Sequence, residues 1–272
     1  MLLPGTAVTD GRGGDLPDSL FARTINCASN SVESSSMQPV TLRHMDPSMN
    51  ELKEALAKGQ ASLSEFTSKR FLSSFGIPVC REVLAESPDS AAAEARKIGY
   101  PVVLKASGSD LAHKTEVGGI ALNLKNIRDV RKEGLRLMKI RGCEALLVQE
   151  MVKGARELVC GLTRDPQLGP CVMFGLGGVF TEVLDDVAFR IAPLTPGDAK
   201  EMIGEIRARK ILDPFRGESA VDQDVLCRIL VSLGRIGVEH EHVAAIDINP
   251  LKVRPDGRPV AVDALVVLRK DV

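Results

Sequence analysis

Residues 243–268 read VAAIDINPLKVRPDGRPVAVDALVVL, two apolar runs on either side of a Pro-Asp-Gly turn centred on Asp256. Proline fixes φ and glycine permits positive φ, so the stretch predicts a β-hairpin. Residues equally far from the turn centre face each other, which places Asn249 opposite Asp263. Asp247 lies two residues before Asn249 and therefore on the same face of its strand.

Three oxygen-bearing side chains on one face of this hairpin predict a metal site. Facing residues of antiparallel strands have Cβ atoms roughly 4.5–5.5 Å apart, and Mg²⁺ takes oxygen ligands at about 2.0–2.1 Å. A carboxylate buried among apolar side chains also needs a cation nearby. We therefore expect Asn249 and Asp263, with Asp247 beside them, to bind Mg²⁺. The alternative is that Asn249-Pro250 only ends a strand and that Asp263 is a solvated edge residue.

The composition of the 272 residues limits the class of protein. The chain is 44% hydrophobic, enough for a full core in one large domain or two small lobes. Its formal net charge of −1 argues against a nucleic-acid or membrane-surface partner. We expect no signal peptide and no membrane span, because no apolar run approaches roughly 20 residues. Six cysteines without CxxC spacing are typical of core residues in a reducing cytoplasm.

The order of periodic segments predicts an α+β fold. Residues 1–47 carry no helical or strand period, and we expect a disordered tail there. From residue 48 onward helices and strands alternate, and the strand-rich stretch 144–195 favours antiparallel sheets over one doubly wound sheet. We expect an N-terminal lobe with the leading helices at 48–148 and a C-terminal lobe with the metal site at 149–272.

Capping residues mark the starts of the expected helices. Ser62 and Glu65 have the spacing of a capping box before a helix that Gly76 would end. Ser87 precedes a proline at the start of the next helix, and Asn126 caps a third.

Lys105 is a candidate for phosphate binding. It lies in the strand pattern PVVLKA, on the same face as Val103. An ammonium group in a buried strand needs a fixed anion, and phosphate is a natural one. The alternative is a lysine at a strand end that reaches solvent.

The loop SGSDLAHKTEVGG, residues 107–119, follows directly. Gly108, Gly118 and Gly119 would allow backbone N–H groups to converge on phosphate oxygens, although an ordinary strand connection has the same composition. His113 lies in this loop beside a lysine, whose charge favours the neutral imidazole that can accept a phosphoryl group. An ordinary loop histidine is the alternative.

Charged residues also lie at two later strands. Glu150 and Glu157 bracket the short link between two predicted strands, which suits an adenine slot with a carboxylate near the ribose or metal. Surface charge at a hairpin gives the same pattern. Arg190 lies in a strand after the glycine turn GLGG, and arginine suits bidentate phosphate contact. A salt bridge to Asp185 or Asp186 is the alternative.

Taken together, these motifs resemble an ATP-grasp domain, from about residue 50 to the end of the chain. The resemblance is to the nucleotide-binding β-type domain of the NDP-forming acyl-CoA synthetases, relatives of succinyl-CoA synthetase. It rests on LSEFTSKRFLSSFGIPV, GYPVVLKASGSDLAHKTEVGGI, VQEMVKGARELVCG, MFGLGGVFTEVLDDVAFRIAPL and AIDINPL with VDALV. It implies two α/β lobes with the nucleotide between them.

The resemblance implies roles for single residues. Lys105 would contact the nucleotide phosphates, Glu150 would lie at the adenine or ribose hinge, and Glu157 would be an acid on the nucleotide side. Asn249 and Asp263 match the Mg²⁺ ligands of the family.

The resemblance also implies a function. His113 matches a histidine that relays phosphate between the subunits of ADP-forming acetyl-CoA synthetases, so the chain would be the nucleotide-binding subunit of such an enzyme in the cytoplasm, using ATP or ADP and Mg²⁺. A CoA-binding α-type subunit would bring the acyl-CoA or acyl phosphate. One alternative is a nucleotide-sensing module like those fused to protein lysine acetyltransferases. Another is a different ATP-grasp ligase that acts through an acyl phosphate.

Overall fold

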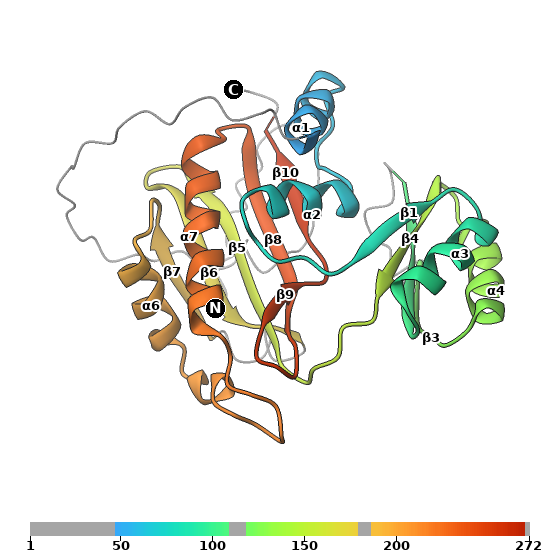
Figure 1. Ribbon diagram of the computed structural model, residues 1–272. Helices are drawn as coiled ribbons and strands as arrows, with labels where there is room; N and C mark the ends of the chain where they lie inside the picture. The colour runs from blue at the N-terminus through green and yellow to red at the C-terminus, as the bar shows by residue number, and fades with distance from the viewer. Residues whose placement is uncertain (1–46, 109–117, 179–185, 270–272) are drawn as a thin grey trace, which may run out of the picture. The chain divides into compact units, whose positions relative to one another are not determined.

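The computed structural model describes residues 47–108, 118–178 and 186–269. The expected disordered tail, 1–47, lies outside them except for its last residue. The elements in chain order are α1 (Pro47–Ala57), α2 (Glu65–Ser74), β1 (Glu82–Ala85), α3 (Pro88–Ile98), β2 (Val102–Ser107), β3 (Ile120–Leu124), α4 (Ile127–Leu137), β4 (Ala145–Glu150), β5 (Glu157–Asp165), β6 (Gly169–Leu176), β7 (Val187–Ile191), α6 (Pro196–Glu205), the 3₁₀ helix η3 (Arg209–Leu212), α7 (Gln223–Glu239), β8 (Val243–Val253), β9 (Pro259–Ala261) and β10 (Leu265–Leu268) (Figure 1). Helices are mixed with antiparallel sheets, so the α+β prediction is confirmed.

A four-stranded antiparallel sheet has the strand order β1-β4-β2-β3. Helices α3 and α4 cover one of its faces (Figure 1), and the core between them includes Ala95, Leu104 and Val148. Successive side chains of a strand point to opposite faces. Because Leu104 of β2 points into this core, Lys105 leaves the opposite face of the sheet.

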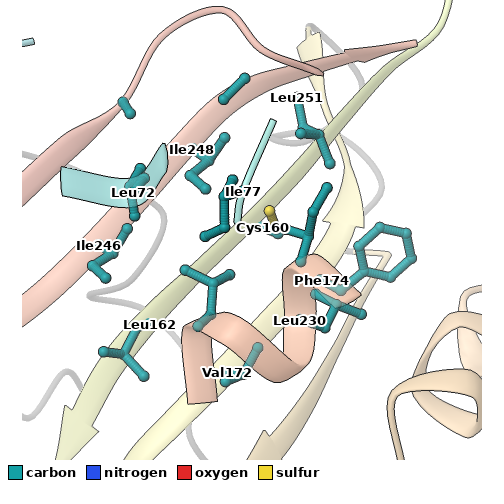
Figure 2. Packing of buried hydrophobic residues seen from close by; sticks show 14 of the residues in the cluster. Leu72, Ile77, Cys160, Leu162, Val172, Phe174, Leu230, Ile246, Ile248 and Leu251 are labelled. Atoms are coloured by element: carbon teal, nitrogen blue, oxygen red, sulfur yellow. The ribbon is translucent and has the colours of Figure 1, made fainter. Parts of the chain in front are cut away.

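A second sheet has the order β10-β8-β5-β6-β7, with β9 beside β8. Its core joins Leu230 of α7 with strand residues such as Leu162 and Phe174, and Leu72 of α2 belongs to the same core (Figure 2). The sequence predicts that the leading helices belong to the N-terminal lobe, but in the structure they pack on this later sheet. The four-stranded sheet is therefore an insertion between α2 and β5, and the division of the chain at residue 149 stays a prediction.

Local capping signals explain where the helices begin. Ser87 caps α3 and Asn126 caps α4, as predicted. Helix α2 begins differently: Ser64 accepts the Thr67 N–H at 3.2 Å and is the cap. Ser62 forms a bridge to Val267 instead, so the prediction of Ser62 as the cap is wrong.

The closing hairpin has the predicted register. Leu251 pairs with Ala261, and Asp247 pairs with Leu265, and both pairs are symmetric about Asp256. The returning arm is interrupted between β9 and β10, which is where Asp263 lies.

Strand β8 contains a bulge next to β5. Asn249 and Pro250 together lie opposite the single residue Val159, while Ile248 and Leu251 on either side of them both point into the core. A bulge locally re-aims side chains and is common beside functional sites. The side chain of Asn249 is exposed.

The described cysteines fit the composition argument in part. Cys80, Cys160 and Cys171 are buried, as expected for core residues, whereas Cys143 and Cys227 are partly exposed. Within the described ranges, no helix has the length and apolar character that crossing a bilayer requires.

Candidate functional site

A cluster of charged side chains lies where α2, β1, β2 and the segment between β9 and β10 meet. Its members are Glu65 and Lys69 of α2, Glu82 of β1, Lys105 of β2, and Asp263. We call these five residues the ion cluster. Lys69 and Lys105 are 0% and 4% exposed. Charges buried to this extent persist only when they are paired.

Lys105 has anionic and carbonyl partners in the cluster. Its Nζ donates to Glu65 Oε1 at 2.6 Å and to the Val262 carbonyl oxygen at 3.4 Å, and it lies 3.6 Å from Asp263 Oδ2. The alternative of a lysine that reaches solvent is wrong. Lys105 is buried in its strand as expected, and the anions beside it in the structure are carboxylates. Its contact with a nucleotide phosphate stays a prediction.

Lys69 has several partners in the cluster and is not among the predicted site residues. Its Nζ donates to Glu65 Oε1 at 2.8 Å, to the Val262 carbonyl oxygen at 3.1 Å and to Gln149 Oε1 at 3.2 Å, and it also pairs with Glu82. Burial alone would lower the pKa of Lys69, but the nearby carboxylates raise it above its ordinary value, so the ammonium stays charged. The available signal was its i,i+4 spacing from Glu65.

Two further groups of the cluster region have unusual environments. Burial raises the pKa of Glu82 to about 7, against the opposing charge of Lys69. The Gln149 Nε2 atom is buried and has no hydrogen-bond partner in the part of the chain that the structure describes. A buried donor without an acceptor is costly, and a ligand can supply the acceptor.

Two of the three predicted metal ligands, Asp247 and Asn249, leave β8 on the face opposite Ile248, which points into the core. Burial, together with the charge of Asp263, raises the pKa of Asp247 to about 6, so these carboxyl groups are close enough to interact. Asn249 is in the adjacent bulge. Across residues 47–108, 118–178 and 186–269 there is no group of three or more His, Cys, Asp or Glu side chains that could hold a metal. The predicted set is of another kind, two carboxylates and an amide.

The charge balance of this region fits a divalent cation. The carboxylates are Glu65, Glu82, Asp247 and Asp263, and the ammonium groups are Lys69 and Lys105. Counted as ionised, these described side chains carry two more negative than positive charges. Oxygen donors with excess negative charge are what Mg²⁺ prefers, so the residues present fit the predicted metal.

Glu150 lies at the end of β4 and links it to the turn after β8. Its carboxylate accepts from Arg254 Nη2 at 2.6 Å and from the Arg81 backbone N–H at 2.8 Å. Burial opposes ionisation, but these two hydrogen bonds hold the pKa of Glu150 below its usual value. The residue lines a pocket of about 470 Å³ with Tyr100 and Lys153. Its predicted place at the adenine or ribose stays a prediction.

Glu157 lies at the start of β5, beside the glycine turn that follows β6. It pairs with Lys252 of β8 at 2.8 Å. A Cβ atom at Gly178 would lie 3.0 Å from Glu157 Oε2, and Gly178 has φ +70°. The glycine therefore keeps space beside the predicted nucleotide-side acid.

Arg190 does not join the other predicted residues. Arg190 pairs with Val172, whose side chain points into the helix-covered core, so Arg190 lies on that face of the sheet. Asp247 is aligned across the strands with Met173, the next residue after Val172, and therefore lies on the opposite face. Arg190 Nη1 donates to Glu205 Oε2 of α6 at 2.9 Å. We therefore do not assign Arg190 to the nucleotide site. The salt-bridge alternative named Asp185 or Asp186; Asp185 lies outside the described residues, and the ion pair that the structure shows is with Glu205.

Of the predicted phosphate loop, the glycines at its ends are described. His113 lies outside the described residues. A Cβ atom at Gly108 would overlap the Gly142 carbonyl oxygen, so packing requires this glycine. Gly118 has φ +65°, a conformation that favours glycine. The Gly119 carbonyl accepts the Ala106 N–H at 2.8 Å and aligns β3 with β2.

Comparison with known proteins identifies close relatives. Residues 54–268 match a family model described as an ATP-grasp domain. The chain is 38% identical over 226 residues to the β subunit of acetate–CoA ligase [ADP-forming] I of Pyrococcus furiosus, covering 79% of this chain and 97% of that protein. It is 43% identical over 210 residues to acetate–CoA ligase [ADP-forming] I of Archaeoglobus fulgidus, covering 74% of this chain and 30% of that protein.

Solved structures agree with these relatives. Ca. Korarchaeum cryptofilum ACD1 in complex with coenzyme A matches with a TM-score of 0.77 and 45% identity, covering 82% of this chain and 100% of that chain. A dinucleotide forming acetyl-coenzyme A synthetase 1 of the same organism, with coenzyme A and Mg-AMPPCP and its phosphohistidine segment pointing towards the nucleotide binding site, matches with a TM-score of 0.73 and 43% identity, covering 82% of this chain and 100% of that chain.

Proposed function

Because the chain belongs to the ATP-grasp family of ADP-forming acetate–CoA ligase β subunits, we propose that it is the nucleotide-binding subunit of an ADP-forming acyl-CoA synthetase. With a CoA-binding α-type partner it interconverts acyl-CoA, ADP and phosphate with the free acid, CoA and ATP. We place this enzyme in the cytoplasm. The partner is part of the proposal, and the name of the Pyrococcus relative, a β subunit, supports it.

One observation carries the proposal. Lys105, from the four-stranded sheet, lies 3.6 Å from Asp263, from the closing hairpin of the other sheet. A nucleotide with its metal needs both an ammonium group near its phosphates and carboxylate oxygens for the cation, because catalysis of phosphoryl transfer depends on positioning and charge neutralisation. The two requirements are met at one point of the molecule.

Different residues bind the phosphates and the cation. Lys105 neutralises phosphate oxygens, and Asn249 and Asp263 hold the cation, with Asp247 contributing negative charge behind them. When bound, Mg²⁺ offsets the phosphate charge that develops during transfer. Gly178 and Glu157 keep a neighbouring edge of the site open on the nucleotide side.

His113 is the proposed phosphoryl carrier. An acyl phosphate formed on the partner gives its phosphoryl group to an imidazole nitrogen, which releases the free acid. The β-phosphate oxygen of ADP then attacks the phosphohistidine, the P–N bond breaks, and ATP and neutral imidazole result. The position of His113, in the loop that directly follows the Lys105 strand, supports this assignment.

Calorimetric titration of the full chain with Mg²⁺-ADP tests the nucleotide site. We expect saturable binding, weakened roughly tenfold or more by Lys105→Met, because a hydrogen-bonded charge contributes about 1.5–3 kcal/mol. Lys58→Met is the control, since this lysine follows α1 directly, is exposed and pairs with Glu54 on the surface. Absence of Mg²⁺-ADP binding by the unmodified chain would refute the proposal.

Reconstitution with the α-type partner tests the carrier. We expect His113→Ala to abolish ATP formation from acetyl-CoA, ADP and phosphate while Mg²⁺-ADP still binds. Full turnover by His113→Ala would remove the carrier role and leave the nucleotide site standing.

A further inference from the structure

We propose that Lys69 is a positioning residue for Lys105: it shares the charge of Glu65 and so leaves the Lys105 ammonium available to a phosphate. The inference rests on the proposed function, because it concerns the lysine assigned there to the nucleotide. Lys69 itself is buried in the ion cluster and is not assigned a contact with substrate.

The shared acceptor is a single carboxylate oxygen. Glu65 Oε1 accepts from Lys69 at 2.8 Å and from Lys105 at 2.6 Å. A carboxylate that faces one buried ammonium forms a closed ion pair with it, and that ammonium has little charge left for a ligand. Here the carboxylate of Glu65 is shared by two ammonium groups, and Lys69 also pairs with Glu82. Lys105 can then bind an anion while Glu65 stays paired with Lys69.

Lys69 also fixes the geometry around Lys105. It reaches Gln149 of β4 at 3.2 Å and the Val262 carbonyl oxygen at 3.1 Å, and the same carbonyl accepts from Lys105 at 3.4 Å. Val262 directly precedes Asp263. One ammonium therefore joins α2, the four-stranded sheet and the residue beside the proposed metal ligand.

The helix that carries Lys69 is well anchored. Phe71 and Leu72, two and three residues further along α2, are both 0% exposed in the core of the larger sheet. The ammonium position is thus set by a packed helix, which is how positioning residues hold a reacting group in place.

A purely structural role makes a different prediction. If Lys69 only compensated buried carboxylates, its replacement would reduce stability, and the effect of that replacement on the nucleotide affinity of the folded protein would not depend on Glu65 or Lys105. The positioning role predicts that the loss of affinity depends on both residues.

A cycle of variants, each measured in the full chain by Mg²⁺-ADP calorimetry, distinguishes the positioning role from the purely structural role. We expect Lys69→Met to weaken binding roughly tenfold, because Lys105 then pairs closely with Glu65. Adding Glu65→Gln should restore most of the affinity, since a neutral amide cannot hold Lys105 as an ion pair. In a Lys105→Met background, Lys69→Met should have no further effect.

Lys58→Met is the matched control, because Lys58, one residue after α1, forms an exposed ion pair of the same i,i+4 spacing with Glu54 at 3.6 Å. It should leave affinity unchanged. If Lys69→Met does not fold, Glu65→Gln alone decides: we expect affinity equal to or tighter than that of the unmodified chain, and a tenfold loss would overturn the inference.

The outcomes distinguish failure of this inference from failure of the proposed function on which it rests. Unchanged affinity in Lys69→Met, with weakened affinity in Lys105→Met, overturns the positioning role and leaves the nucleotide site intact. Failure of the unmodified chain to bind Mg²⁺-ADP overturns both. Restoration by Glu65→Gln only in the presence of Lys105 supports the positioning role.

Discussion

Glu82 is a buried carboxyl group that shares Lys69 with Glu65. Burial raises its pKa from 4.5 to about 7. Between these pH values the unfolded chain loses a proton that the folded chain keeps, so the free energy of unfolding falls as pH rises through this window. The contribution of Glu82 is fully present below pH 4.5 and is lost above pH 7.

Replacing this carboxyl group should remove that pH dependence. We expect the stability of Glu82→Gln relative to the unmodified chain to increase by roughly 1–3 kcal/mol from pH 5 to pH 8. Urea unfolding at several pH values measures the difference, with Glu54→Gln on the exposed side of α1 as the surface control. A constant difference across this range would contradict the assignment.

Single residues also show what sequence patterns can and cannot predict. Lys105 was predictable, because a charge inside an apolar strand is conspicuous. Lys69 was not, since its i,i+4 spacing from Glu65 is the same as that of Lys58 and Glu54 on the surface, and only tertiary packing distinguishes the two pairs. Arg190 was misplaced because the sequence does not say which face of an edge strand meets the helices.

At the scale of elements, Gly154 limits how β4 connects to β5. It has φ +136°, and a Cβ atom there would overlap the Val253 carbonyl oxygen. We expect Gly154→Ala to destabilise the protein by more than about 2 kcal/mol, because both the backbone conformation and the close approach exclude a side chain. Denaturant unfolding gives the value.

Gly204 provides the matched control for this substitution. It lies in helix α6, and an added Cβ atom would meet nothing within 4 Å. We expect Gly204→Ala to be neutral or stabilising by up to about 1 kcal/mol, since alanine favours the helix. Equal effects of the two substitutions would show that the β4–β5 link adapts to a side chain.

The closing hairpin and the first cap mark how far local sequence determines the elements. The hairpin register follows from its turn, so Asp263 could be placed opposite Asn249 from the sequence. The bulge at Asn249 could not be predicted, because it depends on pairing with β5, which is remote in the chain. The cap at Ser62 failed for the same reason, since Ser62 pairs with Val267.

At the scale of the whole molecule, Arg156 connects the start of β5 to the segment before α7. It is 1% exposed, its Nε donates to Glu218 Oε2 at 3.2 Å, and its Nη1 donates to the Asp213 carbonyl oxygen at 3.2 Å. We expect Arg156→Met to cost about 3–5 kcal/mol, because it leaves a carboxylate and several carbonyl groups without their donor.

The control for Arg156 is Arg131, which pairs with Asp89 at 2.7 Å on the surface. We expect Arg131→Met to cost less than about 1 kcal/mol, as exposed ion pairs contribute little. Chemical denaturation compares the two variants. If Arg156→Met lost less stability than Arg131→Met, the segment before α7 would be held by other contacts.

The sequence indicated which stretches form sheets, but not which helices pack on which sheet. Alternating helices and strands indicated two sheets, but nothing in the pattern of α1 and α2 says which sheet their apolar faces meet. The structure assigns them to the later sheet, where Leu63 N–H donates to the Val266 carbonyl oxygen at 2.9 Å. This is a contact between nearly opposite ends of the described chain.

That contact has a consequence for biosynthesis. Helices α1 and α2 leave the ribosome well before β8 and β10, which cover them. The nascent chain must therefore carry Leu72 and its apolar neighbours uncovered until β10 has been made, whereas the inserted four-stranded sheet has all its strands by residue 150. Emergence of the closing hairpin, rather than growth of α1 and α2, is the event that completes the larger core.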